Sequence, residues 1–495
     1  DLRLKEIATG DESGTWGTST NTNLELIAEK FGTGSEALAD SSTVTLTMAD
    51  GTSDAFRSFA LTLTGSLSQA CTVTIAPNTL SNVWVVQNSA GDTVTLTQGS
   101  GANVVIPNGG IKMIATDGAG SGAAVTDVLD LTGGTGNVGL GSGSLGTSLT
   151  TGTDNVAIGE NAGDALSTGS DNTLVGDNAG GALTTGTDNI AIGSAALDAE
   201  DTGARSVAIG SNALSAQNND ANNYNVAVGY NSGAAATSGI RNNFFGAESG
   251  EAVTTGDDNI AIGYQTLTSE TAGNRTVAIG NNALDAQNST TDTNMYNVGV
   301  GYAAGGAVTT GIRNTLIGGL AGDAITDADN NVAVGALALT TNQLGSKSIA
   351  IGDGALSDQN PATATDMYNV AVGHNAGNVV TTGTFNTITG GLAADALTSG
   401  ERNTVYGKSA LTSDTLGSRA VAIGLSALAT QNFTTATDNY NTAVGYSAGG
   451  LITTGTENTI IGGLAGDALT DSDFNTALGS QALSSDTRGA RNTAI

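Results

Sequence analysis

Short apolar stretches recur along most of the chain at a spacing typical of stacked β-structure. The stretch at 155–159 reads NVAIG, it returns as NIAIG at 189–193 and 259–263, and related stretches end at a column of twenty glycines from Gly141 to Gly479. Neighbouring glycines in this column are mostly 17 residues apart. Val and Ile alternate with Ala, which predicts a β-strand. A 17-residue turn holds short strands and tight bends, so the pattern predicts a β-solenoid over residues 132–495.

The alternation also predicts which side chains lie inside the solenoid. We expect Val and Ile to fill the interior and the intervening Ala to face outward, close to another chain. The column glycines are expected to adopt positive φ at a bend.

A second column, four residues before each glycine, is asparagine in sixteen of the twenty turns. The exceptions are Ser206, Thr276, Ser348 and Ala420, and each lies in the turn before a longer polar loop. Stacked asparagines can hydrogen-bond through their amides, so the column predicts a ladder. The long loops recur every 72 residues from Gly229 onward. At ~4.8 Å per strand, one loop emerges every ~19 Å.

A third column, five residues before each glycine, contains most of the basic residues of the repeats together with Asp and Tyr. Stacked neighbours there can form Arg–Asp pairs and Arg–Tyr cation–π contacts. A stabilising ladder and a ligand-binding stripe both fit this column, and the ladder is the simpler interpretation. The best candidates for partner contact lie in or beside the long loops, although these loops also fit a role as solvated decoration. The candidates are Asn223, Tyr224, Asp292, Tyr296, Asp366, Tyr368, Asp438 and Tyr440.

Residues 1–131 lack the 17-residue period. An apolar face of Leu24, Ile27, Ala28 and Phe31 predicts a helix over 23–31, with Thr22 as its cap and Gly32 at its end. Seven strand-like runs follow, and they predict a small β-sandwich or barrel. The runs are 43–48, 60–63, 72–75, 83–87, 93–97, 104–106 and 111–115. The predicted organisation is an attachment segment over 1–40, a β-domain over 41–131 and a solenoid over 132–495. A glycine-rich stretch at 118–123 is a candidate hinge, and 132–136 leads into the solenoid.

Composition narrows the classes of function. The chain has 495 residues, of which 72 are glycine, and a net charge of −31 argues against nucleic-acid binding and against electrostatic attachment to anionic lipid. No apolar run approaches the ~20 residues of a membrane span, and the first residues do not resemble a signal peptide. A lone Cys71 and a lone His374 exclude a disulfide, a catalytic Cys–His pair and a zinc site. Asp-rich turns leave calcium binding open, although ordinary turn chemistry explains them as well.

The motif SVAIG at 206–210, with NVAIG and NIAIG elsewhere, resembles the repeats of YadA-like heads in trimeric autotransporter adhesins. This resemblance implies a left-handed parallel β-roll with three chains in the fibre. The stretches NTAVGYSAG at 441–449 and ALTSDTLGSRAVAIG at 410–424 look more like repeats of bacteriophage tail-fibre proteins. The opening EIATGDESGTWGTSTNTNLELI at 6–27 also resembles the virion-attachment segment of marine phage fibre proteins.

These observations together predict an all-β, homotrimeric virion fibre. Its N-terminal part would dock to other virion proteins, and its shaft would mediate or space attachment to a host receptor or glycan. The alternative is a bacterial surface adhesin. We expect no enzymatic activity, cofactor or bound metal. The candidate virion-docking residues are Trp16, Leu24, Ile27 and Phe31.

Overall fold

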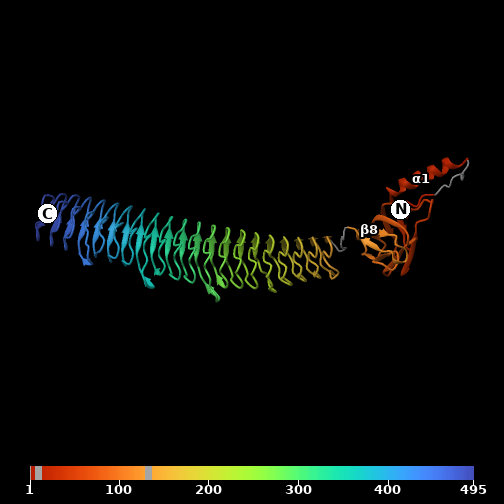
Figure 1. Cartoon of the computed structure of the whole chain (residues 1–495), viewed down its shortest axis with the longest axis horizontal. Coiled ribbons are helices and arrows are strands. Elements are labelled where there is room, and N and C mark those ends of the chain that lie inside the picture. The colour runs from red at the N-terminus through yellow and green to blue at the C-terminus, as the bar shows by residue number, and fades with distance from the viewer. Residues whose placement is uncertain (1, 6–13, 129–135) are drawn as a thin grey trace. The chain divides into compact units, whose positions relative to one another are not determined.

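The computed structural model describes residues 2–5, 14–128 and 136–495. The chain separates into two compact units, Asp1–Arg205 and Ser206–Ile495. In the described part, one α-helix accompanies short β-strands throughout, so the predicted all-β class is confirmed (Figure 1). Residues 129–135 are outside the described part, and with them the predicted boundary between β-domain and solenoid at 131/132.

Helix α1 spans Trp16–Lys30, so it begins seven residues before the predicted start and ends one residue before the predicted end. Its first half is rich in Thr, Ser and Asn, which have low helix propensity. The sequence therefore did not predict this half as helical. Tertiary contacts compensate for this weakness. Asn23 exchanges two hydrogen bonds with the backbone of Lys5, and Lys5 Nζ donates to Ser19. Leu26 is the buried apolar anchor of the helix.

Nine strands form two facing sheets in the N-terminal domain. They are β1 (Thr33–Ala37), β2 (Thr43–Thr47), β3 (Ala60–Thr64), β4 (Cys71–Ala76), β5 (Ser81–Ser89), β6 (Val94–Thr97), β7 (Val104–Ile106), β8 (Ile111–Asp117) and β9 (Val125–Asp127). The seven predicted strands are all present. The two missed strands, β1 and β9, are an edge strand that is poor in apolar residues and a three-residue strand.

The sheet orders are β1-β3-β5-β8-β9 and β2-β4-β6-β7. Strands β1 to β6 alternate between the two sheets and pair in parallel within each sheet. The chain therefore winds around the core of this domain in solenoid-like turns. Antiparallel strands β7, β8 and β9 complete the two sheets. Both sheets contribute to one core, in which Trp84 stacks on Phe56 at 5.1 Å between ring centroids. The two-layer packing agrees with the predicted sandwich, whereas the parallel pairing was not foreseen.

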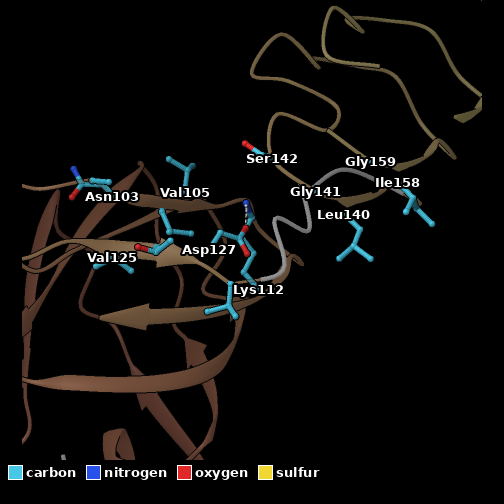
Figure 2. Close-up of a pocket in the computed structure, with 14 residues that line it drawn as sticks. Asn103, Val105, Lys112, Val125, Asp127, Leu140, Gly141, Ser142, Ile158 and Gly159 are labelled. Carbon is cyan, nitrogen blue, oxygen red and sulfur yellow. Dashed lines mark ion pairs between the residues drawn. The ribbon is translucent and has the colours of Figure 1, made fainter. Parts of the chain in front are cut away.

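The glycine-rich stretch at 118–123 is not a hinge. It is a structured corner between β8 and β9, and it contains a short 3₁₀ helix at Gly120–Gly122. Asp117 Oδ1 accepts hydrogen bonds from the backbone N–H groups of Ala119 and Ala124. Across the same two strands, Lys112 Nζ lies 2.9 Å from Asp127 Oδ2 (Figure 2).

The solenoid contributes one parallel sheet of 21 strands in chain order, mostly of three residues. These strands are β10 (Val138–Leu140), β11 (Val156–Ile158), β12 (Thr173–Val175), β13 (Ile190–Ile192), β14 (Val207–Ile209), β15 (Val226–Val228), β16 (Asn243–Phe245), β17 (Ile260–Ile262), β19 (Val277–Ile279), β21 (Val298–Val300), β22 (Thr315–Ile317), β23 (Val332–Val334), β25 (Ile349–Ile351), β27 (Val370–Val372), β28 (Thr387–Thr389), β29 (Thr404–Tyr406), β31 (Val421–Ile423), β33 (Thr442–Val444), β34 (Thr459–Ile461), β35 (Thr476–Leu478) and β36 (Thr493–Ala494). The predicted β-solenoid of about 17 residues per turn is therefore confirmed.

The long loops add two-residue parallel pairs beside this sheet. The pairs are β18 (Gly273–Asn274) with β20 (Thr293–Asn294), β24 (Gly345–Ser346) with β26 (Thr365–Asp366), and β30 (Gly417–Ser418) with β32 (Thr437–Asp438). Each pair joins the turn before a loop to the end of that loop, so the loops are held against the turns.

Two positions contribute to the interior of each turn: the middle residue of the strand and the residue four after the column glycine. A large residue at one position is often accompanied by a small residue at the other. Most strands place a buried Ala in the middle, and many of these turns have Leu four residues after the column glycine, as in Ala191 with Leu197. In β16 the buried middle residue is Phe244, and the position four after its glycine is Gly250. A Cβ on Gly250 would lie 2.5 Å from the Phe244 ring. In these turns a larger side chain at one position is thus offset by a smaller one at the other.

The column glycines are required for two reasons. Gly229 has φ +144°, and a Cβ there would lie 2.3 Å from the carbonyl oxygen of Gly246 in the next turn. The predicted positive φ is confirmed, and the close stacking of turns adds a steric requirement for glycine.

Candidate functional site

The outer face of the solenoid sheet is largely apolar, which reverses the predicted facing, although the first outward residue is Thr or Asn in nine of the 21 strands. In β11, Ala157 is fully buried and Ile158 is exposed, with Val156 half-buried. The same order holds along the sheet, so the expectation that Val and Ile fill the interior is wrong. The buried middle position of the strands is most often Ala, and in other turns it is a larger apolar residue such as Phe244 or Leu316. Exposed members of the outer columns are Val138, Leu140, Ile158, Ile190, Ile192, Phe245, Ile262, Ile317, Ile349, Ile351, Tyr406, Ile461 and Leu478.

The outer columns are continuous within each unit because the strands pair in register. Ile260 pairs with Val277 and Ile262 with Ile279, and the same alignment repeats along the sheet. We call the outward side chains of these strands the outer face. A contiguous exposed apolar surface is uncommon on soluble monomers and typically marks an interaction site. The outer face is therefore the strongest candidate functional surface of the repeats.

One edge of the outer face carries the predicted charged column. Its residues lie five before the glycine and adopt left-handed backbone conformations, as in Asp258 at φ +59°. The guanidinium of Arg241 donates to Asp258 Oδ1 at 2.6 Å. This hydrogen bond lowers the pKa of the Asp258 carboxyl below its usual value, against an opposing effect of burial. The predicted Arg–Asp pairing is confirmed.

The long loops that end at Tyr296, Tyr368 and Tyr440 carry the same kind of cation cluster. Lys347 Nζ lies 2.7 Å from Asp366 Oδ2 and 5.2 Å from the centre of the Tyr368 ring. The Asp366 carboxylate raises the pKa of the Lys347 ammonium. Arg419 repeats this arrangement with Asp438 at 2.9 Å and with the Tyr440 ring. The equivalent cluster of the second loop comprises Arg275, Asn294 and Tyr296.

The predicted contact residues divide into three groups. The four tyrosines at 224, 296, 368 and 440 are half-exposed and remain available to a partner. Asp366 and Asp438 are exposed but serve as ion-pair partners within the chain, and Asp292 accepts a hydrogen bond from Asn274. Asn223 is fully buried, so its prediction as a contact residue is wrong. Asn223 immediately precedes the residue in the left-handed conformation, and that position turns inward in every long loop.

The asparagine ladder is present, with a geometry that differs from simple amide stacking. Asn172 donates its backbone N–H to Asn155 Oδ1 at 3.0 Å, and its side-chain amide donates to the Gly186 carbonyl at 2.9 Å. Each side chain thus links its own turn to the next turn, and amide-to-amide bonds occur only in some turns.

Sequence reasoning missed the residues that bridge the gaps in this ladder. Where the column holds Thr276, Gln287 from the following loop turn is buried beside it and donates to Thr276 Oγ1 at 2.9 Å. Asn297 of the next turn then donates to Gln287 Oε1. The same role falls to Gln217, Gln359 and Gln431. The shared AQN or DQN or TQN sequence at the start of each long loop was the available signal.

Buried acids lie 17 residues before three of these glutamines, at Glu200, Glu270 and Asp414. Glu270 Oε2 accepts from Gln287 at 2.7 Å, while Oε1 accepts the backbone N–H groups of Gly273 and Ser289. Asp414 accepts equivalent bonds from Gln431 and from two backbone groups. Burial raises the pKa of the Asp414 carboxyl, and these hydrogen bonds partly oppose that rise. The acids therefore anchor the bases of the loops.

The predicted docking residues of the N-terminal segment form a stripe on α1. Trp16 is 66% exposed and Phe31, at the end of the helix, is 82% exposed. Leu24 is also exposed, and Ile27 is partly buried. Positions 16, 24, 27 and 31 fall within one side of a helix at 3.6 residues per turn. The buried side of the helix is instead formed by Ser19 and Leu26.

The C-terminal end of α1 is fixed to the sheet by Lys30. Its ammonium donates to Asn82 Oδ1 at 2.6 Å and to the Val83 carbonyl at 2.9 Å, and it lies 5.5 Å from the Trp84 ring centre. Burial, followed by the positive charge of Arg57, lowers the pKa of Lys30 to about 8.

The described residues contain no group of three or more His, Cys, Asp or Glu that could hold a metal ion. His374 is exposed, and Cys71 is buried among apolar residues, which raises the pKa of its thiol. No helix among the described residues has the length and apolar character needed to span a bilayer.

Comparison of the chain with protein-family models, with curated proteins and with solved structures finds no match.

Proposed function

We propose that this chain is a structural fibre of a bacteriophage virion, assembled as a homotrimer. The outer face carries the proposal, because an apolar surface of this regularity needs a cover of equal regularity. A second and a third copy of the same chain supply that cover, since their turns stack with the same spacing along the solenoid. Stacked and fully hydrogen-bonded turns also suit a passive shaft, in which each turn is stabilised by its neighbours.

The width of the outer face favours three copies. From the buried Asn to the column glycine, each turn presents five residues, or ~16 Å of extended chain. Three such faces closed into a triangle leave ~5 Å from each backbone to the axis, half the ~10 Å that separates packed sheets. Val and Ile side chains fill that distance.

The sequence motifs support the assignment to a virion. The repeats resemble those of phage tail fibres, and residues 6–27 resemble a fibre attachment segment. In this proposal the stripe of Trp16, Leu24, Ile27 and Phe31 docks to another virion protein, and the solenoid spaces or mediates attachment to the host cell. The alternative is a trimeric adhesin of a bacterial surface, which rests on the SVAIG motif.

Localisation separates the two functions. Antibodies raised against residues 14–128 are expected to label purified phage particles at the base of a fibre in electron micrographs. A second antibody, raised against the repeats at residues 136–495, is expected to block adsorption to the host cell. Labelling of bacterial envelopes in phage-free cultures would contradict the virion assignment and favour the adhesin.

A further inference from the structure

One turn in every long-loop repeat carries an aromatic or histidine side chain at both edges of the outer face. We call the residue five before the column glycine the leading edge and the residue after the glycine the trailing edge. The pairs are Tyr224 with Tyr230, Tyr296 with Tyr302, Tyr368 with His374, and Tyr440 with Tyr446. All eight side chains are exposed.

Within one chain the two members of a pair cannot meet. A three-residue strand of ~10 Å and the bends at its two ends separate them, so they lie on opposite edges of the face. The pairs also recur only every fourth turn, so successive leading-edge tyrosines are ~19 Å apart along the stack. Each ring therefore lacks a tyrosine neighbour within its own chain.

The leading-edge rings are held in place before any partner arrives. Tyr368 is stacked on Phe385 with 5.5 Å between ring centroids, and Lys347 lies against the same tyrosine. Tyr296 and Tyr440 are held by Arg275 and Arg419. Rings fixed in this way lose little conformational freedom on binding. Their exposed sides remain available to a partner.

The trailing-edge rings are less enclosed. Tyr302 is the most exposed tyrosine of the chain at 64%, and Tyr230 and Tyr446 are also more than half-exposed. Tyrosine is enriched at interfaces because its ring buries area while its hydroxyl stays near water. A trailing-edge tyrosine thus suits the rim of an apolar interface.

From these positions we infer that the leading-edge tyrosine of each pair packs against the trailing-edge residue of the neighbouring copy, which forms an aromatic collar in every repeat. The inference rests on the proposed homotrimer. Cyclic three-fold assembly is head-to-tail around its axis, so each corner joins one edge of a face to the opposite edge of the next face. In parallel copies, Tyr296 of one chain and the partner's Tyr302 lie at the same turn.

The collars give the assembly a register. The outward residues just before the column glycines are mostly Val or Ile, so these side chains alone tolerate a slip by one turn. A slip of one, two or three turns would separate all four aromatic pairs. Only the aligned arrangement keeps all four pairs together.

Photo-oxidative formation of dityrosine tests the collars directly in the full chain. The parent variant is Tyr264→Phe with Tyr406→Phe, which leaves tyrosines only at the two edges. One variant adds Tyr230→Phe, Tyr302→Phe and Tyr446→Phe, and the other adds phenylalanine at positions 224, 296, 368 and 440. Phenylalanine preserves ring packing but cannot form dityrosine. The mass of each variant is measured by light scattering before irradiation.

We expect the parent to give covalent dimers and trimers whose peptides join Tyr296 to Tyr302. Each single-edge variant should lose these products, and trimers co-expressed from both variants should regain them. Trimers that lack edge-to-edge dityrosine, or single-edge variants that cross-link like the parent, would overturn the collar and leave the homotrimer standing. A monomeric mass for the parent would overturn the homotrimer itself and the collar with it.

Discussion

At the scale of single residues, the solenoid is specified by the glycine column and by two interior positions whose sizes are partly coupled. These positions are the residue inside each strand and the residue four after the column glycine. The coupling explains why Ala191 packs with Leu197 and Phe244 with Gly250, and it could have been read from the sequence. Phe244, Leu316 and Leu174 each fall in a turn with glycine at the fourth position. That correlation places both positions inside.

Substitution of the column glycine tests the stacking distance. Gly229→Ala should destabilise the protein by about 2–4 kcal/mol, because the added Cβ meets the Gly246 carbonyl in a left-handed backbone region. Gly319→Ala is the matched control, since nothing lies within 4 Å of the position of its Cβ. Urea denaturation followed by circular dichroism measures both. Equal stability of the two variants would contradict the proposed role of the glycine column.

The exchange of large and small residues predicts a rescue. Phe244→Ala should cost about 3–5 kcal/mol of stability because it leaves a cavity. Adding Gly250→Leu should recover a large part of this loss, since Ala191 with Leu197 already packs in this way. Gly250→Leu alone should destabilise, because its Cβ would clash with the Phe244 ring. Additive effects in this double-mutant cycle would show that the two positions do not share the interior.

The buried hydrogen bond between Gln431 and Asp414 predicts the outcome of a second double-mutant cycle. Asp414→Asn should cost about 1–3 kcal/mol of stability, because the Gln431 NH2 group loses its carboxylate acceptor and faces another NH2 group. Ala420 has no side-chain oxygen that could accept from Gln431 instead. Asn342 is tolerated in the equivalent position because Ser348 accepts from Gln359 at 3.0 Å. Adding Ala420→Ser to Asp414→Asn should therefore restore stability in chemical denaturation. A double variant no more stable than Asp414→Asn would refute this arrangement.

At the scale of elements, alternation identified the strands but not their facing. A period of two separates two faces and is silent about which face is inside, so Val and Ile were assigned inward by hydrophobicity alone. In most strands the inward residue is Ala, packed beside a large residue of the following bend, and the β-branched Val and Ile lie outside. The start of α1 was missed for a related reason, because Lys5 and Asn23 supply tertiary bonds that propensity does not include.

The clamp between α1 and the sheet predicts a pH dependence. The pKa of Lys30 is lowered to about 8 in the folded chain from 10.5, so the folded state releases this proton first. Stability of the N-terminal domain should then rise as pH increases from about 8 to 10.5. Fluorescence of Trp84 during urea unfolding reports this domain, since both tryptophans lie in it.

Lys30→Met is the control, because other groups such as Cys71 titrate in the same range. The difference in unfolding free energy between wild type and Lys30→Met should change with pH in this window in favour of the wild type. A difference that stays flat with pH would contradict the lowered pKa of Lys30.

The outer face predicts a variant that folds but does not assemble. Ile351→Asp places a charge on the apolar face without touching the interior, where Ala350 is the buried neighbour. The trimer should weaken strongly because a carboxylate cannot be buried there without a partner. Thr382→Asp, at an exposed turn position away from the strand, is the control. Unchanged circular dichroism with a lower mass is expected for Ile351→Asp only, and retention of the wild-type mass would contradict the interface.

At the scale of the whole molecule, the repeats were predictable and the function was only partly so. Glycine spacing, the asparagine column and the 72-residue repeat all follow from the sequence and agree with the structure. The candidate surface could not be identified correctly, because its location depends on the facing that sequence alternation leaves undecided. Only one edge of each tyrosine pair was predicted, since Tyr296 is among the contact candidates of the sequence analysis and Tyr302 is not.

The mass of the full chain in solution tests the central claim most directly. Multi-angle light scattering on the purified chain should give ~145 kDa, three times the 48.5 kDa of one chain, at concentrations down to the micromolar range. A mass near 48.5 kDa would mean that the outer face stays exposed to water. That result would contradict the trimeric fibre.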